Sequence, residues 1–526
     1  MITEALQKIG PCLSTELAEY LIKTHGLSPV SARQRISRSE PGVKKLGHLP
    51  FPKKSRFVYL ESQYASYIFW WNLYKAIDDL NGPYSRALKA VRARTLIPIE
   101  HFKAVCGAPK LQKKQVNADM VLERLVNAGI LVKADVTALG WCILTKKTYD
   151  DHSGDFNELS KDIASRLIVE NILLQAVSDW LRRLGMVSYD SVQLRPQNDS
   201  ALPTVGTFAW DLTAPTYIPG LTTTRGGKRL PGFVVCDVLL NKQVKIDDID
   251  PFLNKVNTIQ ILKLIGRTMY IFVADSYSKE AFNALKQLGI VPATTENLFG
   301  SEIAKALKSL IGALEKAARG VVDPDAFLHL FSSLGPLEGA VGNLRGHLFE
   351  FVVAEILRCT VPANTSIEIG RKIKTSKNEA AEIDIWAEQR DKSLRCIECK
   401  GMSSSSFVDD AEIEKWLNKR IPIIQSYLKE KGAQASGLKP VYELWTCGEI
   451  SEQSLNAIAK IKETVHKYEI RVFNVQAILD EAKNSVNKSV IDLLQRVYMQ
   501  PLGLLKAKKG ASVNQDKFSE MLDNTL

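Results

Sequence analysis

Two stretches of the chain resemble one another, with five of eleven residues identical, and this repeat limits the fold more than any single motif does. IDPFLNKVNTI (249–259) aligns without a gap to IEKWLNKRIPI (413–423). Each is preceded by sequence typical of paired strands and an amphipathic helix, and followed by a strand, a polar turn and another helix. We therefore predict two copies of one α/β domain, at 151–300 and 335–483, with a helical linker at 301–334.

The N-terminal part of the chain shows a different order of elements. Residues 1–62 predict three helices followed by a two-stranded ribbon, with Gly26 ending one helix and Ser28 and Pro29 beginning the next. Residues 63–150 repeat the helix, helix, ribbon order. This order resembles a winged helix, in which the last helix can enter a DNA major groove. Residues 484–526 predict a C-terminal helix and a polar tail.

The fold class expected for the whole chain is thus α/β. Each of the two α/β domains should have a central mixed sheet flanked by helices, and two mainly α modules should precede them. At 526 residues the chain is too long for a single hydrophobic core, which agrees with several domains.

The positive charge is concentrated in the first third of the chain. Residues 1–150 hold 23 Lys and Arg against 12 Asp and Glu, so they carry all of the net charge of +11. Such a balance favours a polyanionic partner, and DNA is the partner expected. The candidate nucleic-acid-binding residues lie in the third helix, at the ribbon tip and in the loop TTTRGGKRLPG: Arg33, Gln34, Arg35, Arg38, Lys53, Lys54, Arg56, Arg225, Lys228 and Arg229. A module that contacts protein, and a loop that merely connects two strands, remain alternatives.

Other classes of protein are disfavoured. We find no apolar run of about 18 residues and no secretory signal pattern, so we expect a cytoplasmic protein without a membrane partner. The eight cysteines lie in apolar segments, as reduced core residues do. Cys396 and Cys399 point to opposite faces of a strand, which argues against a shared metal. No zinc-hydrolase or serine-hydrolase motif is present.

Acidic residues form a pattern in the second copy. Glu350 lies in an otherwise apolar helix, Asp384 in the strand AAEIDIWAE, and Glu398 and Lys400 in the returning strand LRCIECKG. A hairpin can set Asp384 beside Glu398, and two such carboxylates repel one another unless a cation lies between them. Mg²⁺ suits hard carboxylates and few protein ligands, with the backbone carbonyl of Cys399 as a further candidate ligand.

This arrangement resembles the active site of the PD-(D/E)XK nuclease superfamily, in its Mrr-like and Holliday-junction-resolvase-like branch. The matching residues are GHLFE at 346–350, Asp384 within EID, and ECK at 398–400; Ile383 stands where the family often has Pro. The resemblance implies a restriction-endonuclease-like fold in which Asp384 and Glu398 bind Mg²⁺, or Mn²⁺ in its place. It also implies that Lys400 positions the attacking water and that Glu350 holds a second metal or orients this water.

The first copy departs from the pattern. Glu170, Asp211 and Asp237 match the three acidic positions, but Leu239 stands where the pattern has Lys. We therefore predict that the first copy is inactive and serves DNA binding, pairing or regulation.

The expected function is a Mg²⁺-dependent DNA endonuclease, with restriction or anti-phage defence as the role suggested by analogy. Two rivals stay open: a non-enzymatic DNA-binding regulator whose nuclease folds are vestigial, and a nuclease subunit of a multi-protein defence complex that needs a partner ATPase. The sequence does not specify the target, the choice of DNA over RNA, the activating signal, or whether the chain forms a homodimer.

Overall fold

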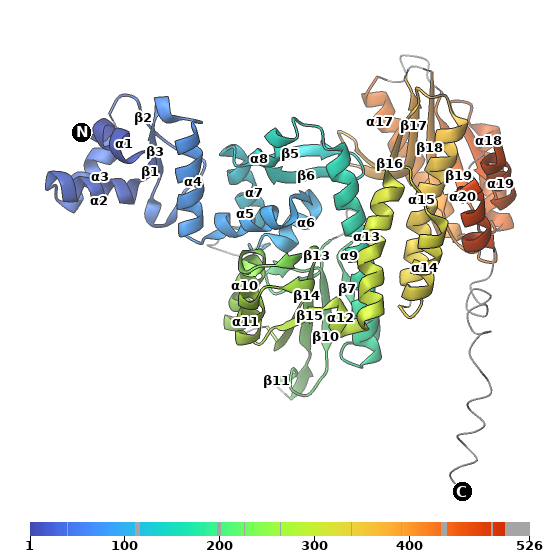
Figure 1. The fold of residues 1–526 in the computed structure, drawn as a ribbon, viewed down its shortest axis with the longest axis horizontal. Helices are drawn as coiled ribbons and strands as arrows, with labels where there is room; N and C mark the ends of the chain where they lie inside the picture. Colours follow the sequence, from blue (N-terminus) through green and yellow to red (C-terminus); the bar gives the residue numbers. More distant parts are fainter. Residues whose placement is uncertain are drawn as a thin grey trace, which may run out of the picture. The chain divides into compact units, whose positions relative to one another are not determined.

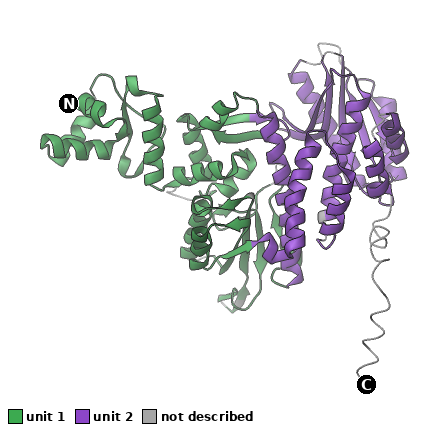
Figure 2. Cartoon of the chain, in the orientation of Figure 1, with its two compact units in different colours: residues 1–134, 141–155, 185–293 green, residues 135–140, 156–184, 294–526 purple. Residues whose placement is uncertain are grey.

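The computed structural model describes residues 1–38, 40–110, 116–196, 201–225, 227–262, 265–337, 339–390, 392–432, 439–484 and 488–499. It divides into two compact units (Figure 2). The first comprises residues 1–134, 141–155 and 185–293, and the second comprises residues 135–140, 156–184 and 294–526. The six segments expected from the sequence are a finer division, and their boundaries stay a prediction.

The first 62 residues form the predicted three helices and ribbon. The elements are α1 (Ile2–Ile9), β1 (Cys12–Leu13), α2 (Ser14–His25), α3 (Pro29–Arg38), β2 (Val43–Lys45), η1 (Pro52–Lys54) and β3 (Phe57–Leu60), with strand order β1-β3-β2. Gly26 ends α2 in the left-handed conformation at φ 62°, which a residue with a Cβ adopts less readily. The Ser28 hydroxyl accepts a hydrogen bond from the Ser31 N–H and so caps α3. The three helices and the two ribbon strands appear in the predicted order, and β1, which was not predicted, joins the ribbon as a third strand.

The same order recurs in the next module. After η2 (Glu61–Gln63) and α4 (Tyr67–Asp79) come α5 (Pro83–Arg94), β4 (Leu96–Pro98), α6 (Ile99–Val105), α7 (Ala118–Asn127), β5 (Leu131–Val136), β6 (Gly140–Thr145) and α8 (Lys146–Asp151). The strand order is β4-β6-β5, with the last strand in the middle as in the first module. Gly129, at φ 70°, lies in the turn before β5.

The first α/β sheet lies in the first unit. Its strand order is β15-β14-β13-β10-β7, made of β7 (Gln193–Leu194), β10 (Leu212–Thr216), β13 (Gly232–Val244), β14 (Thr268–Tyr277) and β15 (Val291–Thr294). The helices α10 (Ile246–Ile261) and α11 (Lys279–Gln287) pack their apolar residues against β13 and β14 (Figure 1). The short elements η3 (Tyr189–Ser191), β8 (Thr204–Val205), β9 (Phe208–Ala209), β11 (Thr223–Arg225) and β12 (Lys228–Leu230) complete this region.

The second α/β sheet lies in the second unit, with strand order β16-β17-β18-β19-β20. Its strands are β16 (Ser366–Lys374), β17 (Ala380–Gln389), β18 (Ser393–Lys400), β19 (Val441–Thr446) and β20 (Glu469–Phe473). The helices of this unit are α9 (Asn157–Arg183), α12 (Thr295–Phe299), α13 (Ser301–Ala318), α14 (Pro324–Leu334), α15 (Ala340–Thr360), α16 (Asp410–Lys415), the π-helix η4 (Trp416–Arg420), α17 (Ile421–Glu430), α18 (Glu452–Thr464), α19 (Val475–Asn484), α20 (Lys488–Leu493) and the π-helix η6 (Leu494–Met499).

The two sheets share one topology, as the sequence repeat predicts. The pairs β10–β13 and β17–β18 are antiparallel, and the pairs β13–β14 and β18–β19 are parallel. The repeated sequence segments form α10 in one case and α16, η4 and the start of α17 in the other. The α9 helix, expected to open the first copy, belongs to the second unit instead.

No helix among the described residues is both long enough and apolar enough to cross a membrane. Seven of the eight cysteines are buried as predicted, whereas Cys359 is exposed.

Candidate active site

Asp384 and Glu398 lie on neighbouring strands of the second sheet. The antiparallel ladder of β17 and β18 pairs Ile385 with Ile397, and the two acidic residues come one position beyond this pair. The backbone N–H of Cys399 donates a hydrogen bond of 2.6 Å to Oδ2 of Asp384, which fixes this carboxylate against β18. Glu398 itself is buried, with 4% of its surface exposed. The sequence-based prediction that a hairpin brings these carboxylates together agrees with this geometry.

Two cations contact the Glu398 carboxylate. The Lys400 Nζ lies 3.0 Å from Oε1 of Glu398 and 3.2 Å from Oε2 of Glu412. The Arg420 Nη1 makes an ion pair with the same oxygen of Glu398, and its Nη2 lies 3.8 Å from Glu412. The predicted Lys400 therefore does reach Glu398, and it shares this carboxylate with an arginine that the sequence analysis did not select.

Several acidic side chains of the site lie close enough to raise one another's pKa values. Burial, and then the charges of Glu398 and Glu350, raise the pKa of Asp384 well above its ordinary value. Burial likewise raises the pKa of Glu382, to which Glu350 also contributes. Burial by itself would lower the pKa of Lys400, but the attraction of Glu398 and Asp384 raises it, which keeps the ammonium charged. A cluster of this kind favours the binding of a further cation.

Glu350 projects from α15, the helix that packs along β16, β17 and β18 (Figure 1). Its Oε1 lies 3.5 Å from Nδ1 of His347, one turn earlier in the helix. Burial opposes protonation of His347, but its hydrogen bond to Glu350 raises the pKa of the imidazole. Glu350 thus raises the pKa of Asp384 and has His347 as a neighbour, and its predicted role in holding a second metal or orienting the water stays a prediction.

The donor set is compatible with a divalent ion. Asp384 and Glu398 supply two hard carboxylates, and a cation between them would relieve the repulsion that raises the pKa of Asp384. In the part of the chain that the structure describes, however, no three or more His, Cys, Asp or Glu side chains are grouped so that they could hold a metal ion. In this arrangement Lys400 and Arg420 neutralise Glu398. Ligation by the Cys399 carbonyl stays a prediction.

Sequence reasoning missed Arg420, Glu412 and Glu382. Glu412 and Arg420 lie in the segment that joins β18 to β19, far from the strand motif in sequence. The repeat with residues 249–259 gave no signal for Arg420, because the lysine of α10, Lys255, aligns with Lys419. Glu382 stands two residues before Asp384, so strand periodicity alone places it on the same face.

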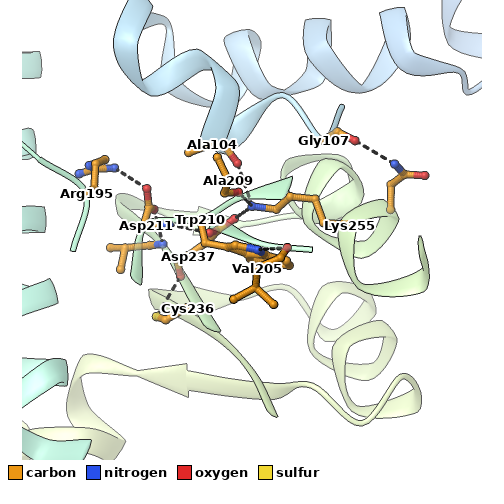
Figure 3. Close-up of polar contacts among 12 residues, drawn as sticks. Ala104, Gly107, Arg195, Val205, Ala209, Trp210, Asp211, Cys236, Asp237 and Lys255 are labelled. Carbon is orange, nitrogen blue, oxygen red and sulfur yellow. Dashed lines mark hydrogen bonds and ion pairs between the residues drawn. The ribbon is translucent and has the colours of Figure 1, made fainter. Parts of the chain in front are cut away.

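The first copy keeps the same arrangement of carboxylates. Asp211 and Asp237 come one position beyond the pair Leu212–Cys236. Oδ2 of Asp211 accepts a hydrogen bond of 3.0 Å from the N–H of Val238, the residue after Asp237, just as Asp384 accepts one from the residue after Glu398. Asp211 also pairs with Arg195 at 3.0 Å (Figure 3). The predicted match between the two copies is therefore visible in their hydrogen bonds.

A buried lysine completes the first copy. Leu239 does stand where Lys400 stands in the second copy, but an ammonium still reaches the carboxylates, from Lys255 in α10. The Lys255 Nζ makes an ion pair with Asp237 and donates hydrogen bonds to the carbonyls of Ala104, at 2.8 Å, and Ala209, at 3.1 Å (Figure 3). Lys255 is 1% exposed. In this copy a helix thus supplies a cation that the strand lacks, and the inactivity of the first copy stays a prediction.

Glu170 is the remaining acidic residue that the sequence matched to the first copy. It lies in α9, within the second unit, and the Nε of Arg166 is 3.6 Å from its carboxylate. Its assignment as an acidic position of the first copy rested on its helical context alone.

The predicted nucleic-acid-binding residues of the first module are largely exposed. Arg33, Gln34, Arg35 and Arg38 are exposed on α3, and Lys53 and Lys54 are exposed in η1. Arg56 is only half-buried, and its Nη1 donates to the carbonyl of Gly47 at 2.9 Å.

The basic loop of the first α/β domain is described only in part. The backbones of β11 and β12 pair with Arg225 opposite Lys228, but these two side chains lie outside the described residues. Arg229 is exposed and donates hydrogen bonds to the Tyr217 carbonyl, at 2.9 Å, and the Thr222 hydroxyl, at 3.1 Å. These bonds hold Arg229 along its own loop.

No protein-family model matches the chain, and the searches of curated proteins and of solved structures found no significant match.

Proposed function

We propose that the chain is a divalent-metal-dependent endonuclease that hydrolyses phosphodiester bonds in DNA, with its active site in residues 335–483. The observation that carries this proposal is the convergence of Asp384, Glu398 and Lys400 at one place on β17 and β18, with Asp384 fixed by the Cys399 N–H. Two carboxylates and a charged ammonium form the set that the PD-(D/E)XK resemblance requires. The sheet order and the helix that carries Glu350 support the same assignment.

The residues divide the chemistry among them. Asp384 and Glu398 would hold Mg²⁺ or Mn²⁺, which supplies Lewis-acid activation of a bound water and stabilises charge on the phosphate. Lys400 donates to the attacking water and offsets negative charge that develops on the phosphoryl oxygens. Glu350, beside His347, orients this water or accepts its proton.

The N-terminal modules have different roles in this proposal. The exposed basic side chains of α3 and η1 suit the phosphate backbone of DNA, and winged-helix-like binding places α3 in the groove. The corresponding helix of the second module, α7, instead carries Asp119 and Glu123, and Asp119 pairs with Lys103 at 2.8 Å. We assign DNA contact to the first module and a supporting role to the second.

A cleavage assay tests the proposal. Purified protein is incubated with plasmid, linear, branched and methylated DNA and with RNA, with Mg²⁺, with Mn²⁺ and with chelator. We expect metal-dependent cleavage of at least one DNA, and loss of about 10²-fold or more in rate for Lys400→Ala with DNA binding nearly unchanged. Lys415→Ala is the matched control, because Lys415 is more exposed and contacts only Glu412 among the carboxylates of the site.

The same assay distinguishes the rival functions. Tight DNA binding without cleavage under every condition would favour a regulator. Cleavage that appears only when the products of neighbouring genes are added would favour a subunit of a larger assembly with a partner ATPase. Restriction or anti-phage defence in the cytoplasm, with or without a homodimer, is the biological role that we propose on the strength of the resemblance.

A further inference from the structure

In each α/β sheet, the second carboxylate of the acidic pair forms an ion pair with a basic side chain from a helix. In the first sheet this cation is Lys255 of α10, on Asp237. In the second it is Arg420, the last residue of η4, on Glu398. Both helices follow the strand that carries the carboxylate, and both come from the repeated sequence segment.

The two cations do not occupy equivalent positions in the sequence repeat. The gapless alignment of residues 249–259 with residues 413–423 pairs Lys255 with Lys419, but Lys419 is exposed. The cause is the π-helix η4, whose wider turn shifts the side chains that follow by one position, whereas α10 is α-helical throughout its 16 residues. The π-turn thus presents an arginine, instead of the aligned lysine, to the second site.

The surroundings of the two cations differ in a way that bears on function. Lys255 is sealed: its ammonium also donates to two backbone carbonyls and lies 4.0 Å from the ring centre of Trp210 (Figure 3). Arg420 has 18% of its side chain exposed, and its two ion-pair partners are carboxylates, Glu398 and Glu412. A guanidinium held in this way can leave Glu398 without leaving a buried carbonyl unpaired.

We propose that Arg420 is a phosphate-binding residue of the active site, which pairs with Glu398 until a divalent metal takes this carboxylate. This inference rests on the proposed nuclease function. Oε1 of Glu398 already receives both Lys400 and Arg420, so a metal ligated by Glu398 competes with Arg420 and repels it. The planar guanidinium then matches the paired oxygens of a phosphodiester, which are the chemical equivalent of the carboxylate that it leaves.

Metal binding and DNA binding, measured separately, test this assignment. Mn²⁺ affinity is measured by calorimetry without DNA, and DNA affinity is measured with Ca²⁺ and with chelator. For Arg420→Ala we expect Mn²⁺ to bind roughly tenfold more tightly, because a competing charge is gone. We also expect the gain in DNA affinity on adding Ca²⁺ to fall by about tenfold, and cleavage by about 10²-fold.

Three variants complete the design. Lys419→Ala removes a positive charge from the neighbouring exposed position, so we expect wild-type metal affinity and DNA affinity from it. Arg420→Lys keeps the charge but not the planar fork, and should leave Mn²⁺ affinity near wild type while lowering DNA affinity in Ca²⁺. Arg420→Gln, which can still hydrogen-bond Glu398, replaces Arg420→Ala if the latter does not fold. Like Arg420→Ala, it should bind Mn²⁺ more tightly and should gain less DNA affinity when Ca²⁺ is added.

The outcomes separate this inference from the proposed function. If Arg420→Ala and Arg420→Gln bind Mn²⁺ no more tightly than wild type, or keep the full effect of Ca²⁺ on DNA affinity, Arg420 is only a structural partner of Glu398. A different outcome is a wild type that cuts no nucleic acid while Arg420→Ala shows the expected changes in Mn²⁺ affinity and in the effect of Ca²⁺ on DNA affinity. In that case the role of Arg420 stands and the nuclease proposal fails.

Discussion

Lys255, the buried lysine of α10 that pairs with Asp237 of the first sheet, allows a quantitative prediction. In Lys255→Met the ammonium is lost, and Asp237 remains 2% exposed beside Asp211 without its cation. The carbonyls of Ala104 and Ala209 lose a donor as well. Removing one partner of a buried pair costs about 3–5 kcal/mol, and we expect about 4 kcal/mol for this substitution at pH 8.

The cost should depend on pH, and its sign follows from Asp237. Burial, together with the charge of Asp211, raises the pKa of Asp237 from 3.8 to about 6 although Lys255 lowers it. Without Lys255 this pKa rises further, so at pH 5 the carboxyl is protonated and its burial costs less. A carboxyl whose pKa is raised in the folded state favours folding only while it is protonated. Its contribution to stability is therefore complete below pH 3.8 and is lost as the pH rises through about 6. The loss in Lys255→Met should therefore be smaller at pH 5 than at pH 8.

Denaturant unfolding and hydrogen exchange measure the effect. A chain with two compact units need not unfold in one step, so exchange of the β13 amides assigns the loss to the first sheet. The matched control is Lys242→Met, because Lys242 pairs with Asp248 at 2.8 Å but is 30% exposed, and should cost less than about 1 kcal/mol. The double variant Lys255→Met, Asp237→Asn removes both charges and should recover about 2 kcal/mol.

The reasoning would be refuted by a Lys255→Met protein whose β13 amides exchange as in the wild type at pH 8. A loss of the same size at pH 5 and pH 8 would also count against it, since the penalty would then not come from the unpaired carboxylate.

Two further predictions concern the N-terminal module. Replacing Arg33 and Arg35 by Ala should weaken DNA binding at low salt and reduce the slope of log affinity against log salt by about 2, and an unchanged slope would exclude phosphate contacts by these side chains. Burial would raise the pKa of Glu40, but hydrogen bonds from Thr3 and Ile2 lower it from 4.5 to about 2. The contribution of the Glu40 carboxylate to folding stability is therefore present above pH 4.5 and is lost as the pH falls toward 2. After allowance for solvent screening, Glu40→Gln should cost about 1 kcal/mol at pH 7 and almost nothing at pH 2 in acid and urea titrations.

Local patterns in the sequence determined much of the fold. Gly26, Ser28 and Pro29 marked the end of one helix and the start of the next, because left-handed backbone, a capping hydroxyl and a fixed φ are properties of single residues. The repeated segment predicted two sheets of one topology, which the strand order and the strand directions confirm. Alternation along two strands likewise placed Asp384 near Glu398, since strand periodicity and hairpin register are local properties.

The tertiary structure alone decided which cations meet these carboxylates. Lys255 lies 18 residues after Asp237, and Arg420 lies 22 residues after Glu398. Sequence spacing does not reveal such contacts, because they depend on how a whole helix packs across the sheet. The π-turn of η4 then selected Arg420 over the aligned Lys419. One extra residue in a helical turn rotates every side chain that follows, and a gapless alignment contains no record of that rotation.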